Sequence, residues 1–275
     1  MTEFGTEVVL HWTAVGIYIA AAVLFGNAVI FDHPHRTRLA IVLTAAGLLP
    51  HGAAIILRWL EVGHGPYMLK YEVLSSNTWI AIAMLVIFLL RRPDWSVLAL
   101  VVVPVSILMI AMGLFSNPQM RELPPALRSM WLVFHISFAK VSGAAFLLSV
   151  ASGVVLLLKE RPRHWPWLDR IPDEAALDAY IVRFVGFGFL FWTITVAAGA
   201  IWANESWGRY WGWDVIETWS LITWLVYGTF LHVRLFFKLK PKATAWWAIG
   251  CMAVFVLTIL ILPFLMPSLH STYFQ

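Results

Sequence analysis

The sequence predicts an all-α fold: a polytopic transmembrane bundle of about eight helical spans, with both termini outside the membrane. Apolar residues make up 61% of the 275 positions and charged residues only 12%, against about 25% charged in soluble domains. The apolar residues also fall in long blocks, several of them near or above the ~20 residues needed to cross a bilayer. Such a chain cannot cover a water-facing surface with polar groups.

The spans follow one another without internal repeats or low-complexity segments. They are predicted at approximately 8–30, 39–60, 74–90, 95–115, 131–158, 179–202, 214–236 and 244–266. The longest polar break, 159–178, has about twenty residues and is too short for a separate domain. A single integral membrane domain, 1–275, is therefore expected.

Basic residues predict the orientation of the spans. About twelve lysines and arginines lie near 36–38, 91–92, 159–170 and 234–242, and only about five lie on the opposite side, so the first set is cytoplasmic. The distribution of the basic residues is more informative than the net charge of +4, and no nucleic-acid partner is expected. The lone Cys251 excludes a disulfide framework, a zinc site and a CxxC redox pair.

Arg58, Arg183 and Lys140 are basic residues inside predicted spans. Arg58 and Arg183 lie close enough to span ends to extend toward the interface. Lys140 lies ~14 Å into the fifth span. It is expected either to pair within the bundle or face a water-filled cavity, or to serve as the counter-charge of an anionic ligand such as a haem propionate.

The segment at about 203–219 forms an outer loop that contains Trp207–Asp214, WGRYWGWD. One interpretation is an interfacial aromatic belt in which Asp214 caps the next helix. The other is a ligand site, because Gly208 and Gly212 allow close approach of the backbone and the indole rings of Trp207, Trp211 and Trp213 suit a large planar ligand such as a porphyrin.

A haem ligand must be a histidine with an unprotonated ring nitrogen at the depth of the haem. His135 lies about 6 Å into the fifth span from outside, and His270 directly follows the last span. Both lie at the level of the tryptophan segment, and we predict that they bind the haem iron against that aromatic floor. The remaining outer and loop histidines are expected to be solvated: His11, His33, His35, His64 and His164.

His232 lies ~27 Å from the outer surface, near the cytoplasmic side. It is therefore expected to face protein, water or a ligand rather than lipid. His51 lies about 13 Å below the outer surface. This difference in depth argues against coordination of one iron by both histidines. The second ligand to a haem at His232 could therefore come from a partner protein, from His51 or from His11.

The tryptophan segment resembles the W-G-x-x-W-x-W-D signature of the haem-handling proteins of cytochrome c assembly, here Trp207, Gly208, Trp211, Trp213 and Asp214, followed by Glu217. The chain is most similar to the CcsA (ResC) branch of system II. Four more segments carry the resemblance: GHGPYMLKYE at 63–72, PPALRSMWLVFHIS at 124–137, ITWLVYGTFLHVR at 222–234 and LPFLMPSLHS at 262–271.

The resemblance implies that His135 and His270 bind haem b outside the membrane and that His232 helps to bind haem in transit, with a CcsB-type protein as partner. The chain would then deliver haem across the inner (plasma) membrane, with the tryptophan loop on the periplasmic side. It would present the haem to the CxxCH motif of apocytochrome c for thioether attachment. Whether it is an enzyme or only the haem-binding subunit of a holocytochrome c synthase (haem lyase) stays open.

Two other functions are compatible with a haem-binding membrane bundle. A haem exporter or chaperone without ligation activity would use the same loop and histidines. A haem b electron carrier would place paired histidines on facing helices at equal depth, and the sequence offers no convincing pair. A small-molecule transporter would show internal repeats and broken helices, which are not apparent.

Overall fold

The structure is a computed structural model that describes residues 4–116, 123–161 and 165–266. The described residues contain helices and no strand, and eight of these helices are long and apolar enough to cross a membrane. The all-α fold class and the number of spans are therefore confirmed. Two compact units make up the molecule, residues 1–121 with 154–177 and residues 122–153 with 178–275. The single domain over 1–275 stays a prediction.

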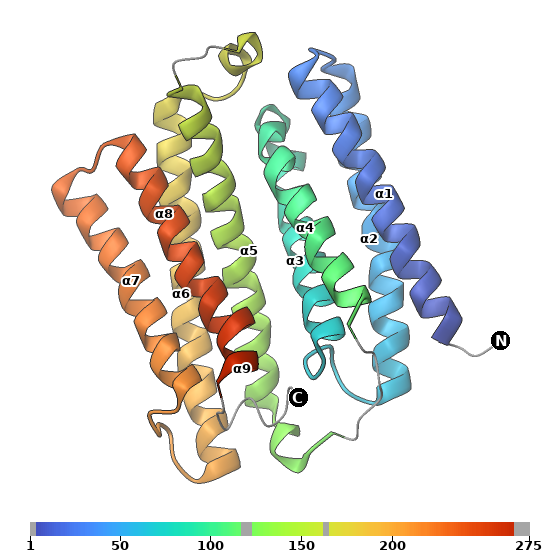
Figure 1. Ribbon diagram of the computed structural model, residues 1–275, viewed down its shortest axis with the longest axis vertical. Helices are drawn as coiled ribbons and strands as arrows, with labels where there is room; N and C mark the ends of the chain where they lie inside the picture. The colour runs from blue at the N-terminus through green and yellow to red at the C-terminus, as the bar shows by residue number, and fades with distance from the viewer. Residues whose placement is uncertain (1–3, 117–122, 162–164, 267–275) are drawn as a thin grey trace. The chain divides into compact units, whose positions relative to one another are not determined.

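Unit 1 contains a four-helix bundle, in which each helix packs against the next and α4 packs back against α1. Figure 1 shows the four helices side by side in blue to green. Their bounds are α1 Phe4–Ile30, α2 His35–Val62, α3 Lys70–Arg91 and α4 Ala99–Leu114, and the 3₁₀ helix η1, Pro93–Leu98, precedes α4. Unit 1 also includes the 3₁₀ helix η3, Pro166–Arg170.

Over its described residues, unit 2 consists of four long helices or helix segments and three short helical turns. They are the 3₁₀ helix η2 Pro125–Leu127, α5 Met130–Lys159 (as far as 153), α6 Glu174–Trp207 (from 178), α7 Val215–Phe237, α8 Pro241–Val256, the π-helical turn η4 Leu257–Ile261 and α9 Leu262–Leu265. Ser149 on α5 donates to the Ile181 carbonyl on α6, at 3.2 Å. Phe146 on α5 stacks on Tyr227 of α7, with ring centroids 3.7 Å apart. These contacts join α5 to α6 and α7.

The surfaces of the helices carry large apolar side chains. Leu49, Leu60 and Phe115 are 74%, 75% and 82% exposed, and each lies within or next to a span-length helix. Water would make so much exposed apolar surface costly, whereas lipid tails accept it. The chain is thus a multi-pass membrane protein. Lys140 is 9% exposed, as expected for a charge inside a bundle.

Candidate functional site

One pocket of unit 2 is formed by the loop between α6 and α7, by the beginning of α5 and by the parts of α6 and α7 next to the loop. The space that it encloses, counted together with the open solvent at its mouth, is about 360 Å³. Four elements contribute its walls, namely α5, α6, the tryptophan loop and α7. The lining residues are His135, Val196, Gly199, Ala200, Ala203, Tyr210, Trp211, Ile216, Glu217 and Ser220.

His135 projects into this pocket from the second turn of α5. Its Nδ1 lies 2.8 Å from the backbone carbonyl oxygen of Thr195 on α6. A carbonyl only accepts, so Nδ1 must carry the proton, and the neutral ring then has an unprotonated Nε2. A second-sphere bond of this kind orients a histidine that ligates a metal.

Small residues on α6 make room for the His135 ring. A Cβ atom at Gly199 would lie 2.6 Å from His135 Nδ1, closer than atoms can approach without displacing the imidazole. About one helical turn further along α6, Trp202 stacks on the His135 ring, with ring centroids 6.1 Å apart and an angle of 27° between the ring planes. Trp202 is itself anchored, because its Nε1 donates to the Ala126 carbonyl at 2.8 Å. The imidazole is therefore held by a hydrogen bond and an aromatic face.

The loop from Gly208 to Asp214 is closed by a capping box at the start of α7. The Asp214 side chain accepts from the Ile216 N–H at 3.3 Å, which confirms its predicted role as the N-cap. Glu217 reaches back, and its Oε2 accepts from the N–H groups of Gly212 at 2.7 Å and Asp214 at 3.1 Å. This carboxylate is 8% exposed, so its hydrogen bonds are shielded from water and fix the shape of the loop.

The sequence suggests that the two loop glycines allow a ligand to approach the backbone closely. The structure gives other reasons why glycine is needed at these positions. Gly208 has a φ of +73°, and nothing lies within 4 Å of a Cβ placed there. It is needed for its left-handed backbone, which allows α6 to end. At Gly212 a Cβ would overlap the guanidinium of Arg209. Here the missing side chain accommodates a protein neighbour.

The three tryptophans of the loop occupy different environments. Trp211 lines the pocket with Tyr210. Trp207 is half-buried and packs edge-on against Trp202, with centroids 4.9 Å apart. Trp213 is 71% exposed, with a φ of +57°. The sequence treats the three rings as one aromatic floor, whereas within the described pocket only Trp211 supplies an indole from this loop.

Of the other two predicted haem ligands, His232 does not line this pocket. His232 lies on α7 far along the helix from the loop, is exposed, and contacts the Phe236 ring at 4.5 Å between centroids. Beside it, Arg234 pairs with Asp178 of α6. His270 lies outside the described residues, and its prediction as the second ligand rests on the sequence.

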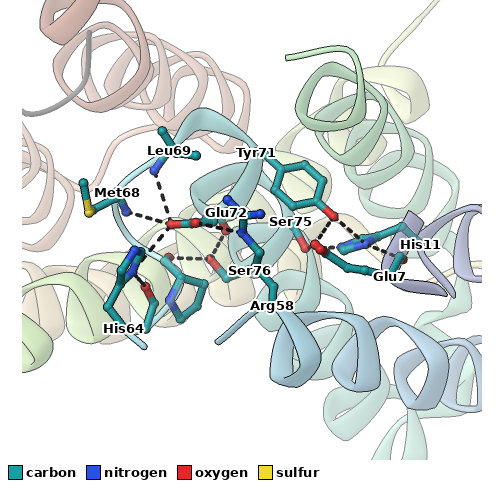
Figure 2. Close-up of polar contacts among 12 residues, drawn as sticks. Glu7, His11, Arg58, His64, Met68, Leu69, Tyr71, Glu72, Ser75 and Ser76 are labelled. Atoms are coloured by element: carbon teal, nitrogen blue, oxygen red, sulfur yellow. Dashed lines mark hydrogen bonds and ion pairs between the residues drawn. The ribbon is translucent and has the colours of Figure 1, made fainter. Parts of the chain in front are cut away.

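Unit 1 contains a buried polar cluster that corrects three expectations (Figure 2). Arg58 does not extend to the interface: it is 2% exposed and pairs with Glu72, Nε to Oε1 at 3.2 Å. His11 and His64 are not solvated, at 1% and 4% exposed. The physical reason is that Glu7 and Glu72 bring compensating acceptors into the bundle, so polar groups at these positions are satisfied inside it.

The sequence did not single out Thr195, Gly199 or Trp202, which orient His135. Thr195 acts through its backbone carbonyl, which any residue type provides. Gly199 carried a signal, because Ala197, Ala198, Gly199 and Ala200 form a run of small residues that allows close packing in membrane helices. The run does not say which side chain fills the space.

The donor set of the pocket fits a planar metalloporphyrin. It combines an oriented imidazole, aromatic rings of Tyr210 and Trp211, and the small residues of α6. Glu217 Oε1 is buried without a hydrogen-bond partner among the described residues, so its charge disfavours an anionic group in direct contact. A haem would therefore turn its propionates away from Glu217.

Comparison with known proteins connects this chain to cytochrome c assembly. A model of the cytochrome C assembly protein family matches residues 67–270. A cytochrome c biogenesis protein CcsA of Parasynechococcus marenigrum is 34% identical over 231 residues, which are 73% of this chain and 75% of that protein. One from Prochlorococcus marinus is 30% identical over 271 residues, 87% of this chain and 85% of the relative.

A solved structure shares the fold. The cytochrome c haem lyase CcmF superposes with a TM-score of 0.73 at 16% identity, covering 100% of this chain and 49% of the lyase. At that identity the likeness concerns the arrangement of helices.

Proposed function

The chain belongs to the cytochrome c assembly protein family, and from this premise we propose that it binds haem b in the His135 pocket and presents it to apocytochrome c. It has a role in cytochrome c biogenesis, like the CcsA relatives. In the proposed reaction each cysteine S–H of a CxxCH motif adds across a haem vinyl group to form a thioether, and no group leaves. Haem and apocytochrome c are both substrates.

The observation that carries the proposal is the orientation of His135. Its Nδ1–H is held by the Thr195 carbonyl at 2.8 Å, so the Nε2 lone pair suits coordination of iron inside a pocket lined by Trp211 and Tyr210. We place the second axial ligand at His270, because the motif and the position after the last span favour it. Axial imidazoles would also influence the redox state of the iron.

The protein contributes position rather than a nucleophile. Cys251 is 2% exposed on α8 and far in sequence from the loop, so both thiols come from the apocytochrome. Holding the porphyrin on a rigid loop raises the effective concentration of its vinyl groups. The capping box of Asp214 and Glu217 supplies that rigidity. The proposed activity is that of the haem-binding subunit of a holocytochrome c synthase.

We assign the delivery of haem across the membrane to His232. This histidine is exposed on α7 beside Phe236, and eighteen residues separate it from Asp214, about 27 Å along a helix. Both ring nitrogens of His11 and of His51 are hydrogen-bonded. A CcsB-type partner is therefore a better source of the second ligand than either histidine. Charge asymmetry favours the periplasmic side of the plasma membrane for the pocket.

Haem spectra of purified protein test the ligand assignments. The protein is purified with and without a CcsB-type partner, as wild type and as His135→Ala, His270→Ala, His232→Ala and the control His35→Ala, an exposed position. Haem content should fall in the first three variants and should remain at the wild-type level in the control. Unchanged haem in all three would contradict the proposal.

The yield of mature cytochrome c separates the proposed function from its alternatives. A synthase subunit predicts variants that retain haem but fail to make cytochrome c, for example when loop residues change. An exporter without ligation activity predicts that cytochrome c yield follows haem content in every variant. A haem b electron carrier predicts normal cytochrome c in variants that have lost haem.

A further inference from the structure

The two carboxylate oxygens of Glu217 have different environments. Oε2 accepts from the backbone N–H groups of Gly212 and Asp214, at 2.7 and 3.1 Å. Oε1 is buried and has no hydrogen-bond partner among the described residues. The residue as a whole is 8% exposed, and it lines the same pocket as His135. One oxygen therefore holds the tryptophan loop, and the other is left for what enters the pocket.

The support of the loop does not explain the second oxygen. Both loop N–H groups bond to Oε2, and the amide oxygen of a glutamine would accept the same two bonds. A buried charged oxygen without a donor costs free energy. An atom of this kind in a folded protein calls for a reason, such as a catalytic role or a bound ligand. Under the proposed function, the substrates are the source of the missing donor.

Of the two substrates, the apocytochrome supplies that donor. An iron porphyrin has no N–H group, and its propionates are turned away from the charge of Glu217. Haem carries its vinyl groups on the half of the ring opposite the propionates, so the vinyl half lies on the Glu217 side. A cysteine of CxxCH must reach a vinyl group to form a thioether. Its S–H, a weak donor, then comes within reach of Oε1.

The other polar groups of the pocket are less suited to take the thiol proton. Of the ten residues that line it, Glu217 is the only carboxylate. His135 donates its Nδ1–H to the Thr195 carbonyl, and the proposed function uses its Nε2 for iron. Tyr210 and Ser220 contribute hydroxyl groups, which carry their own proton at neutral pH. Within this pocket the carboxylate is thus the best proton acceptor.

We propose, on the basis of the proposed function, that Glu217 is a catalytic residue that moves the thiol proton to the vinyl group. Oε1 accepts the S–H proton, and the thiolate that remains is the nucleophile. A sulfur electron pair forms the S–C bond at the vinyl carbon next to the ring. The vinyl π-bond opens, and its electron pair takes the proton back from Glu217 at the terminal carbon. Glu217 is again a carboxylate, no group leaves, and no oxidant or reductant is consumed.

Glu217→Gln separates this role from the support of the loop. The amide oxygen can still accept from the two loop N–H groups, whereas the NH₂ group in the place of Oε1 cannot take a proton. Wild type and variant are purified in complex with a CcsB-type partner, loaded with haem and mixed with reduced CxxCH apocytochrome. Absorbance of the pyridine haemochrome distinguishes vinyl-bearing haem from haem joined by thioethers and gives the rate of attachment.

The variant should bind haem and react slowly. We expect haem content and hydrogen exchange at Gly212 and Asp214 to stay at the wild-type level, because the loop keeps its acceptor. Thioether formation at pH 7 should slow about 100-fold, the usual contribution of a positioned proton acceptor. Glu205→Gln is the matched control, since this exposed carboxylate of α6 does not line the pocket, and it should react at the wild-type rate.

The pH dependence of attachment gives a readout that a purely structural role would not change. A free cysteine has a pKa of about 8.5, so without a proton acceptor the rate should rise about tenfold per pH unit between about pH 6 and 8. The variant should show this rise, and the wild type should be nearly independent of pH. The other charged groups beside the carboxylate are Asp214 of the capping box and Arg209, whose guanidinium lies next to Gly212.

Two results with the variant would overturn the proposal. One is attachment at the wild-type rate, and the other is slow attachment with a pH-independent rate, which would assign to Glu217 a structural role alone. If the variant fails to hold haem, the wild-type profile decides, because a tenfold rise per pH unit in the wild type also overturns the proposal. A wild-type complex that holds haem but forms no thioether would instead contradict the proposed function.

Discussion

Two histidines near the beginnings of long helices, His11 on α1 and His135 on α5, engage their ring nitrogens differently. His11 has hydrogen-bonding atoms at both nitrogens, Glu7 and Tyr71 on one side and Ser75 on the other. His135 donates Nδ1–H to the Thr195 carbonyl, beside small residues and Trp211. Position along a helix is similar for the two. What surrounds each ring makes one a link in a buried network and the other a candidate metal ligand.

Each unit also contains a buried carboxylate, and the two carboxylates have different structural roles. Glu72 in unit 1 pairs with Arg58, and its second oxygen accepts from the Met68 and Leu69 N–H groups at 3.1 and 3.3 Å. Glu217 in unit 2 holds backbone N–H groups of the tryptophan loop. The first joins α2 to the start of α3, whereas the second shapes a loop. Four substitutions test this comparison.

The largest effect is expected at Arg58. Arg58→Met removes the cation beside Glu72 within the bundle and should lower the free energy of unfolding by about 3–5 kcal/mol. Chemical denaturation in detergent measures it. The control is Arg92→Met, since the pair with Asp94 is 44% and 56% exposed and contributes about 0–1 kcal/mol. Equal losses of unfolding free energy in the two variants would show that the buried pair contributes no more to stability than the exposed pair.

Glu217→Ala should release the tryptophan loop. Two backbone N–H groups lose a charged acceptor, and the total cost should be about 1.5–3 kcal/mol, because Gly212 and Asp214 are partly exposed and water can replace part of the interaction. Hydrogen exchange at Gly212 and Asp214 should accelerate, and haem retention should fall. Glu205→Ala, an exposed carboxylate of α6, serves as control. Unchanged exchange at both amides would mean that the loop keeps its shape without the carboxylate.

Gly199→Ala tests the orientation of His135 without removing it. The new Cβ would lie 2.6 Å from Nδ1, so the ring must leave the Thr195 carbonyl, and haem affinity should fall about tenfold. Gly186→Ala on the same helix meets nothing within 4 Å and should bind haem normally. Haem titration followed by absorbance compares them, and matching affinities would contradict the second-sphere role.

The smallest effect is expected at Gly208. Its φ of +73° strains any residue with a Cβ, so Gly208→Ala should cost about 1 kcal/mol of stability. Gly208→Asn should recover part of this loss, because asparagine tolerates the left-handed region. Haem binding should stay unchanged, since open space surrounds the position. Thermal unfolding should rank the three proteins by stability, with glycine first, asparagine second and alanine last. A loss of haem binding in these variants would instead show that Gly208 contacts the ligand.

Much of the fold was predictable because lipid imposes it. Apolar blocks of span length predict helices wherever backbone groups have no water to bond, and the predicted 131–158 agrees with α5, Met130–Lys159. Boundaries were less accurate where a helix extends beyond the apolar block. The predicted 179–202 became α6, Glu174–Trp207, because its ends are polar and the hydropathy pattern cannot register them.

The candidate site was predictable only in part. His135, Trp211 and the Asp214 cap were recognisable from local sequence, since each belongs to a motif of contiguous residues. The expectation that His11 and His64 are solvated was wrong. The side chains that surround His11 come from distant positions: Tyr71 and Ser75 are 60 and 64 residues from it. No local pattern reports such a pairing.

The sequence by itself determined three features: that the chain crosses the membrane as helices, at which residues the tryptophan loop lies, and how α7 begins. These features depend on composition and on contacts within a few residues. Only the tertiary structure decided which histidine nitrogens carry protons, that Arg58 is buried beside Glu72, and that Gly199 makes room for His135. Each of these depends on atoms from different helices, and their hydrogen bonds exist only once the helices have packed.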